Sequence, residues 1–196
     1  MNFKKVLFLI LGIFCVVSGQ PAWADSYKVD KDHTSVSFKI RHLFSNTQGT
    51  FRDFEGTVEY DPDKPETWSA AGTIKVDSID TNEAGRDKHL RSKDFFDSAA
   101  FPTISFKTTQ VTDATKDSAK VEGLFTMHGV EKPITLDVQI HGAGNDPWGN
   151  VRAGFTATTK INRKDFGIIY NQVLDKGQLM LGEEVLITIE LEAIKV

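Results

Sequence analysis

The side chains best suited to ligand chemistry form one basic cluster. Arg86, His89 and Arg91 lie close together in a 196-residue chain that has 23 Lys and Arg against 27 Asp and Glu. Guanidinium groups bind phosphates and similar oxygen-rich groups through paired hydrogen bonds. If this segment borders a lipid-binding cavity, the three residues are predicted to contact the head group of the lipid. The alternative is a solvated helix face, on which Asp87 and Asp94 neutralise part of the charge.

The motifs of the common enzyme classes are absent from the sequence. It contains no G-x-S-x-G, no H-E-x-x-H, no phosphate-binding loop and no dinucleotide fingerprint. The histidines lack the spacing of metal ligands; they are His33, His42, His89, His128 and His141. We therefore predict no catalytic residues, no metal site and no cofactor. A lipid-modifying hydrolase or isomerase that uses His33 or His89 as its base is the alternative.

Residues 1–24 have the features of a cleaved secretion signal. Two lysines precede an apolar run over residues 6–17, and Ala22-Trp23-Ala24 provides small residues at the cleavage positions. We expect cleavage after Ala24, export to a bacterial periplasm, and one mature domain over residues 25–196. Secretion into the medium is the alternative. Because the one cysteine, Cys15, lies within the signal, the mature chain would have no disulfide.

The expected mature chain is mildly acidic, with 21 basic and 27 acidic side chains once the two lysines of the signal are removed. Nucleic acids are bound chiefly through clustered basic charge, so no nucleic-acid partner is expected. Anionic membrane surfaces are disfavoured for the same reason. The apolar run of the signal has about twelve residues, fewer than the ~20 needed to span a bilayer. No later segment is as long, so stable membrane insertion is not expected.

Apolar and polar residues alternate with a period of two along most of the mature chain. This period is typical of β-strands with one buried face. The clearest segments span residues 35–41, 134–141 and 184–192. With weaker examples there are about eight such segments, separated by turns rich in Gly, Pro and Asp. We therefore predict an all-β domain that forms an eight-stranded antiparallel barrel, because closure removes the unpaired edges of the sheet.

One segment has helical spacing instead. The pattern predicts a helix over residues 82–96, with Thr81 as its N-cap. Asp87 and Arg91 are spaced for an ion pair one turn apart. The residues expected on its inner face are Leu90 and Phe95. We expect this helix to lie near the mouth of the barrel.

A second irregular stretch, residues 43–54, carries Phe44, Phe51 and Phe54 near Gly49. It lacks the clean alternation of a strand. We expect it to form a flap or a short helix against the barrel mouth.

The alternation alone does not fix which way the apolar face points. An outer-membrane barrel would turn it to lipid and would need aromatic girdles, whereas the mature chain has few Trp and Tyr residues. A soluble barrel that turns the face inward is therefore favoured, with either a packed core or a lumen for a long hydrocarbon. For a lumen, the predicted lining residues are Val36, Phe38, Ile40, Phe106, Phe125, Leu136, Val138, Phe155, Ile187 and Ile189.

Three strings in the sequence are similar to those of a known family. They are D-H-T-S-V-S-F at 32–38, R-D-K-H-L-R-S-K-D-F-F at 86–96 and N-R-K-D-F-G at 162–167. Together they resemble the YceI-like family of polyisoprenoid-binding periplasmic proteins, over essentially the whole mature chain. The departures are Thr34, where Ser is commoner, and Phe44, where Gly often follows Leu.

The resemblance implies an extended, lipocalin-like barrel with one or two short helices near its mouth. Its apolar lumen would hold a long isoprenoid lipid, such as a polyprenyl phosphate or a quinone-type lipid, for storage or transport in the periplasm without enzymatic activity. A ligand-free structural protein with a role in stress protection is a further alternative. The sequence does not distinguish a monomer from a homodimer.

Overall fold

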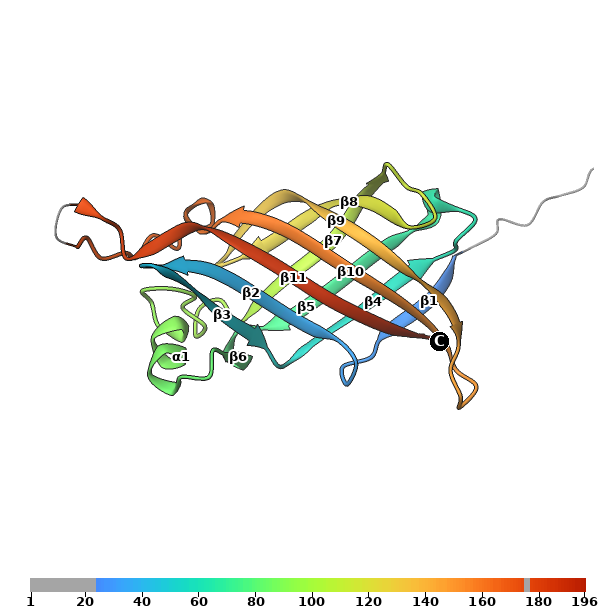
Figure 1. Cartoon of the computed structure of the whole chain (residues 1–196), viewed down its shortest axis with the longest axis horizontal. Helices are drawn as coiled ribbons and strands as arrows, with labels where there is room; N and C mark the ends of the chain where they lie inside the picture. Colours follow the sequence, from blue (N-terminus) through green and yellow to red (C-terminus); the bar gives the residue numbers. More distant parts are fainter. Residues whose placement is uncertain (1–23, 175–176) are drawn as a thin grey trace, which may run out of the picture.

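The computed structural model describes residues 24–174 and 177–196. The predicted secretion signal therefore lies outside the described residues, apart from Ala24. The described chain forms a long antiparallel barrel with one α-helix (Figure 1). The strands are β1 (Asp25–Val29), β2 (Ser35–His42), β3 (Ser45–Phe51), β4 (Phe54–Tyr60), β5 (Ser69–Lys75), β6 (Ile79–Asp80), β7 (Thr103–Thr112), β8 (Ser118–Met127), β9 (Val130–Asn145), β10 (Val151–Asn162) and β11 (Leu181–Lys195). The helices are α1 (Ala84–Arg91) and the 3-10 turns η1 (Pro65–Thr67), η2 (Val76–Ser78) and η3 (Arg163–Phe166).

Eight strands close the barrel in the order β1-β4-β5-β7-β8-β9-β10-β11, and β11 pairs back with β1. The other paired stretch of β11 lies against β2, which is followed in the sheet by β3 and β6. Along β11, residues 181–190 pair with β2 and residues 193–195 pair with β1. All of these pairings are antiparallel, so the predicted eight-stranded barrel is confirmed.

The alternation of side chains separates the two faces of the wall. On β9, Ile134, Leu136 and Val138 border the interior, whereas Thr135 and Asp137 between them are exposed. The strands are also long: β10 has 12 residues and spans about 40 Å at ~3.3 Å per residue. The barrel is therefore long in the direction of its strands (Figure 1).

One end of the barrel, where β1 begins and β11 ends, is filled by aromatic rings. The Tyr60 ring lies 4.9 Å from Trp68 between centroids and meets Phe155 edge-on at 5.1 Å. Tyr27 packs beside Tyr60 at 6.5 Å, and Ala193 is fully buried against this cluster. We call this the closed end. The opposite end, which carries α1 and the β2–β3 turn, is the mouth (Figure 1).

The helix at the mouth is shorter than predicted and is capped differently. It spans Ala84–Arg91, and the carboxylate of Glu83 accepts hydrogen bonds from the backbone of Gly85 and Arg86. Thr81 is therefore not the N-cap; its backbone N–H and hydroxyl both donate to the buried Asp87 carboxylate, at 2.9 and 2.5 Å. The predicted N-cap was wrong because the Thr81 hydroxyl donates to Asp87, a residue within the helix, and does not accept from the first backbone N–H groups.

The predicted Asp87–Arg91 ion pair is also wrong, because Asp87 is committed to Thr81. The expected inner face is confirmed: Phe95 is buried, and Leu90 packs against the same apolar core. Within the described chain, no helix has the length and apolar character needed to cross a bilayer.

Residues 43–54 form a strand and a turn, so the predicted flap or short helix is wrong. The β2–β3 hairpin turns at Leu43 and Phe44, and β3 then runs to Phe51. Leu43 has a φ of 48°, a left-handed conformation that aliphatic side chains rarely adopt. Its backbone N–H donates to the Met180 carbonyl at 2.9 Å, which joins the turn to the segment that precedes β11.

Candidate functional site

The barrel encloses an elongated cavity of about 640 Å³. Ligand pockets in proteins typically measure ~300–1,000 Å³, so this space is large enough for a small molecule or a lipid chain. Its wall is almost entirely apolar. All ten residues predicted to line a lumen border it: Val36, Phe38, Ile40, Phe106, Phe125, Leu136, Val138, Phe155, Ile187 and Ile189. Their contact with a ligand stays a prediction.

Small residues on the inner face keep the cavity from filling. Ala157 lies between Val138 of β9 and Ile189 of β11 and adds only a methyl group to the wall. A Cβ built on Gly123 would lie 2.3 Å from the Phe106 ring, so that ring occupies the space above the glycine. The Phe106 ring thus packs against the wall at Gly123.

The mouth brings together rings from α1, from the segment after it and from the connection between β10 and β11. His89, Phe95 and Tyr170 contact one another, with ring centroids 5.0 to 5.1 Å apart. All three border the cavity. The Nε2 atom of His89 is 2.8 Å from the Asp94 carboxylate, which holds the imidazole in place.

The three predicted head-group residues are not equally placed. Arg86 and His89 border the cavity. The Arg86 guanidinium donates to the hydroxyl and the carbonyl of Thr81, at 2.7 and 2.8 Å. Arg91 is not among the lining residues, because its guanidinium donates to the carbonyls of Asp77 and Ile79 and so fastens α1 to the neighbouring chain. Head-group contact by all three stays a prediction.

Sequence reasoning missed Arg163, the most deeply buried charge at the mouth. Arg163 is 4% exposed and borders the cavity. Its Nε donates to the Gly182 carbonyl at 2.9 Å and its Nη1 to the Ile168 carbonyl at 2.7 Å. Its Nη2 is buried and has no hydrogen-bond partner within the described chain. Burial lowers the pKa of the guanidinium, but arginine stays protonated in proteins near neutral pH.

The strand period contained a signal for Arg163. The inward positions of β10 run in steps of two from Ala153 to Ile161, and the next step is Arg163. A charged residue in register with a buried apolar row is unusual unless it has a partner or a ligand.

The charged residues that border the cavity differ in sign and in position. Within the described chain, those at the mouth are His42, Arg86, His89 and Arg163, which are all basic. Glu55 and Glu59 of β4 also border the cavity, but the inward positions of this strand are Phe54, Gly56, Val58 and Tyr60, so the two carboxylates lie on its outer face. Charges act strongly on one another where water is excluded. The mouth half of the cavity therefore favours a negatively charged or electron-rich group.

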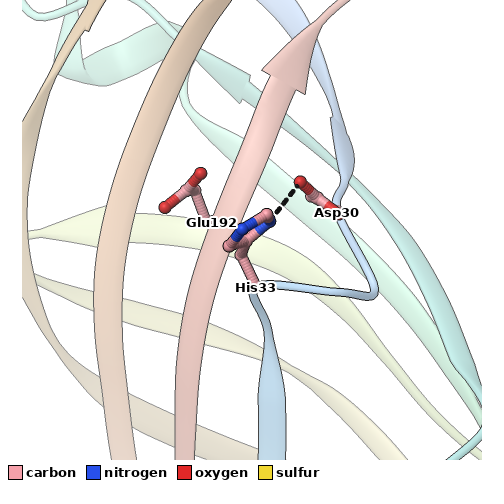
Figure 2. A group of neighbouring side chains, drawn as sticks. All are labelled: Asp30, His33 and Glu192. Atoms are coloured by element: carbon pink, nitrogen blue, oxygen red, sulfur yellow. Dashed lines mark hydrogen bonds and ion pairs between the residues drawn. The ribbon is translucent and has the colours of Figure 1, made fainter. Parts of the chain in front are cut away.

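A second cluster of polar residues lies outside the cavity, near the closed end. Figure 2 shows Asp30, His33 and Glu192, whose ligand atoms lie within 4.8 Å of one another, a spacing that a metal ion could accept. However, Nη1 of Arg152 donates to Asp30 and Glu192 at 2.6 and 2.5 Å, and its Nε donates to Asp146 at 2.7 Å. The guanidinium thus takes the place of a cation between these carboxylates.

These contacts have an electrostatic consequence for Asp30. The hydrogen bond from Arg152, followed by that from His33, lowers the pKa of Asp30 to about 2. His33, one of the two bases considered for a lipid-modifying enzyme, belongs to this outer cluster and does not border the cavity. Through Arg152, the cluster joins the β9–β10 connection to the turn between β1 and β2 and to β11.

Known proteins resemble this chain along most of its length. The sequence model of the YceI-like domain matches residues 27–193. A UPF0312 protein of Pseudomonas fluorescens (strain SBW25) is 42% identical over 195 residues, covering 98% of this chain and 97% of that protein. The crystal structure of Burkholderia cenocepacia BcnA is similar with a TM-score of 0.74 and 26% identity, covering 84% and 98%. A polyisoprenoid binding domain from Saccharophagus degradans, implicated in plant cell wall breakdown, shares the fold with a TM-score of 0.66 and 14% identity, covering 87% and 98%.

Proposed function

The chain belongs to the family of YceI-like domains, and from this premise we propose that it binds a long isoprenoid lipid in its barrel. The lipid would be of the polyprenyl phosphate or quinone type, and it would be stored or carried without chemical change. The domain from Saccharophagus degradans that shares this fold is a polyisoprenoid binding domain, which supports the choice of lipid. The predicted secretion signal supports a periplasmic location.

The observation that carries the proposal is the shape and lining of the cavity. It extends from Tyr60 and Trp68 at the closed end to His89 and Arg163 at the mouth, and its wall is apolar over almost the whole distance. Burial of one methylene contributes ~0.8 kcal/mol, so a chain of several isoprene units would be held mainly by removal from water. A compact polar ligand would gain little from such a wall.

The charges at the mouth give the bound lipid a direction. The tail would point toward the aromatic rings of the closed end, which offer few hydrogen-bond partners. The head group would lie near Arg86, His89 and Arg163, where its oxygens meet positive charge. This orientation also explains why a deeply buried guanidinium is tolerated in an apolar wall: the ligand would supply the missing negative charge.

Extraction of the purified protein tests the proposal. Organic solvent applied to protein purified from its native host should release an isoprenoid that mass spectrometry identifies. Ala157→Trp, which fills the centre of the lumen, should return an empty extract. Thr158→Trp places the same ring on the outer face of the same strand and should still yield the lipid. Empty extracts from the wild type, or equal yields from all three proteins, would contradict the proposal.

A further inference from the structure

The mouth exposes large apolar side chains on two separate segments. Phe44 at the tip of the β2–β3 hairpin is 83% exposed, and Ile169 and Val173 between β10 and β11 are 70% and 71% exposed. Leu43 and Leu179 are exposed beside them. We call these five residues the mouth rim. Large exposed apolar side chains that gather at one end of a protein mark a site of interaction with another protein or with a membrane.

The mouth rim is continuous with the lining of the cavity. In the segment between β10 and β11, Ile168 and Tyr170 border the cavity, whereas Ile169 between them points to solvent. The two parts of the rim are joined by the hydrogen bond from the Leu43 backbone to Met180, which itself borders the cavity. The end of the apolar interior and the exposed apolar surface are therefore built by neighbouring residues of the same segment.

Four exposed basic side chains lie on the elements of the mouth, although the whole chain is acidic. The exposed side chains of Arg41, Arg86, Lys88 and Lys93 lie on β2, α1 and the turn after α1. Within residues 24–174 and 177–196, none of the four forms an ion pair. Elsewhere many basic side chains are paired with carboxylates; examples are Lys31–Asp53, Lys120–Asp137, Lys160–Glu184 and Lys195–Asp25. The elements of the mouth also expose two carboxylates, of which Glu83 caps α1 and Asp94 pairs with His89, so in the described part of the chain the four cations are left without an acidic partner.

We propose that the mouth rim docks on the surface of a lipid bilayer that contains anionic lipids. The apolar tips would enter the boundary between head groups and acyl chains, and the four cations would lie over anionic head groups. This arrangement brings the mouth of the cavity to the source of a water-insoluble ligand. The inference rests on the proposed lipid-binding function for its biological purpose, but the docking itself requires only the rim and the cations.

A second copy of the chain fits this surface less well than a bilayer does. A twofold interface places the same patch of both copies face to face. It would place Arg41, Lys88 and Lys93 of both copies in one interface, where like charges repel. A bilayer with anionic head groups offers the opposite charge around an apolar interior, which matches the rim.

Flotation with lipid vesicles tests the inference. The wild type should float with vesicles of phosphatidylcholine and phosphatidylglycerol, and more weakly with phosphatidylcholine alone. The triple variant Phe44→Ser/Ile169→Ser/Val173→Ser should lose at least about tenfold in apparent affinity, because its apolar tips are gone. The matched control Trp148→Ser removes an exposed apolar side chain from the β9–β10 connection, at the other end of the barrel, and should float like the wild type.

Three results would overturn the inference. The first is a wild type that does not float, and the second is equal flotation of the rim variant and the wild type. The third is a rim variant that loses only self-association, measured by light scattering, while its vesicle binding is unchanged.

Loading with lipid from an ethanol solution, in the absence of vesicles, separates this inference from the proposed function. The rim variant should still take up lipid, because its cavity is intact. If no protein takes up lipid while flotation still depends on the rim, docking is supported and the proposed lipid-binding function fails.

Discussion

Both ends of the barrel use aromatic side chains, but they use them in opposite ways. At the closed end, Tyr27, Tyr60 and Phe155 are buried and their rings contact one another. At the mouth, Phe44 points into solvent and Tyr170 borders the cavity. The closed end resembles an ordinary protein core. The mouth instead exposes apolar side chains to solvent, which folding alone does not require.

The difference follows from how the strands end. At the closed end, β1, β4 and β10 run close together, so their inward side chains meet across the axis. At the mouth, α1 and the segment between β10 and β11 are placed between the strand ends and bring basic residues with them. We infer that the closed end mainly provides stability and the mouth mainly provides function.

The largest expected effect compares one residue type at the two ends. Phe155→Ala should lower the free energy of unfolding by about 3 kcal/mol, because it removes a buried ring that contacts Tyr60. Phe44→Ala should change it by less than about 0.5 kcal/mol, since that ring contributes little burial. Urea unfolding followed by circular dichroism measures both. Similar losses of unfolding free energy at the two positions would contradict the proposed difference between the two ends.

A smaller effect is expected from the buried guanidinium at the mouth. Arg163→Met should weaken the binding of a lipid with an anionic head group by about tenfold, because a charged hydrogen-bond partner is lost. A neutral lipid with the same tail should bind the variant and the wild type equally. Lys164→Met removes the neighbouring charge, which is bound to Glu183 outside the cavity, and serves as the control. Titration with both lipids gives the ratio of affinities for each protein.

An equal loss for the anionic and the neutral lipid in Arg163→Met would show that Arg163 only supports the fold. Its hydrogen bonds to the carbonyls of Gly182 and Ile168 would then be its whole contribution.

The smallest effect is a change in acid stability near the closed end. The pKa of Asp30 is about 2 in the folded chain, below the ~3.9 of an unfolded Asp. Its contribution to stability is therefore complete above about pH 4 and is lost as the pH falls toward about 2. Arg152→Gln removes the main cause of the low pKa, so acid unfolding should begin at a higher pH.

The matched control for this acid titration is Arg52→Gln. Arg52 pairs with Asp80 at 3.0 Å but is largely exposed, so its removal should shift the acid midpoint less. Fluorescence-monitored unfolding between pH 2 and pH 5 distinguishes the two variants. An equal shift of the acid midpoint in both variants would show that the ion pairs of Arg152 stabilise the fold no more than an exposed ion pair does.

The wall of the barrel could be predicted because the alternation of apolar and polar residues within each strand shows which side chains face inward. A period of two placed Leu136, Val138 and Ile187 on the inner face, and the structure puts all three on the cavity. The failures depended on contacts between distant residues. Residues 43–54 did not look like a strand because Gly49 interrupts them, yet the Phe38 ring of the neighbouring strand fills the space above that glycine.

The mouth was harder to predict for the same reason. The choice between Thr81 and Glu83 as the cap of α1 depends on Asp87, which accepts two hydrogen bonds from Thr81. The burial of Arg163 depends on a carbonyl of β11 that is remote in sequence. Arg86 and His89 border the cavity, and their contact with a head group stays a prediction; the cluster of basic residues in the sequence could not show that Arg91 turns toward backbone carbonyls instead.

The most direct test of the account uses Trp68, which borders the cavity at its closed end. Bromine atoms on a lipid chain quench tryptophan fluorescence at short range. A long-chain lipid phosphate brominated near the end of its tail should quench the protein, and the same lipid brominated near its head group should not. Trp68→Phe should abolish this difference. If neither lipid quenches Trp68, or if both quench it equally, then no lipid tail lies along the barrel axis toward the closed end.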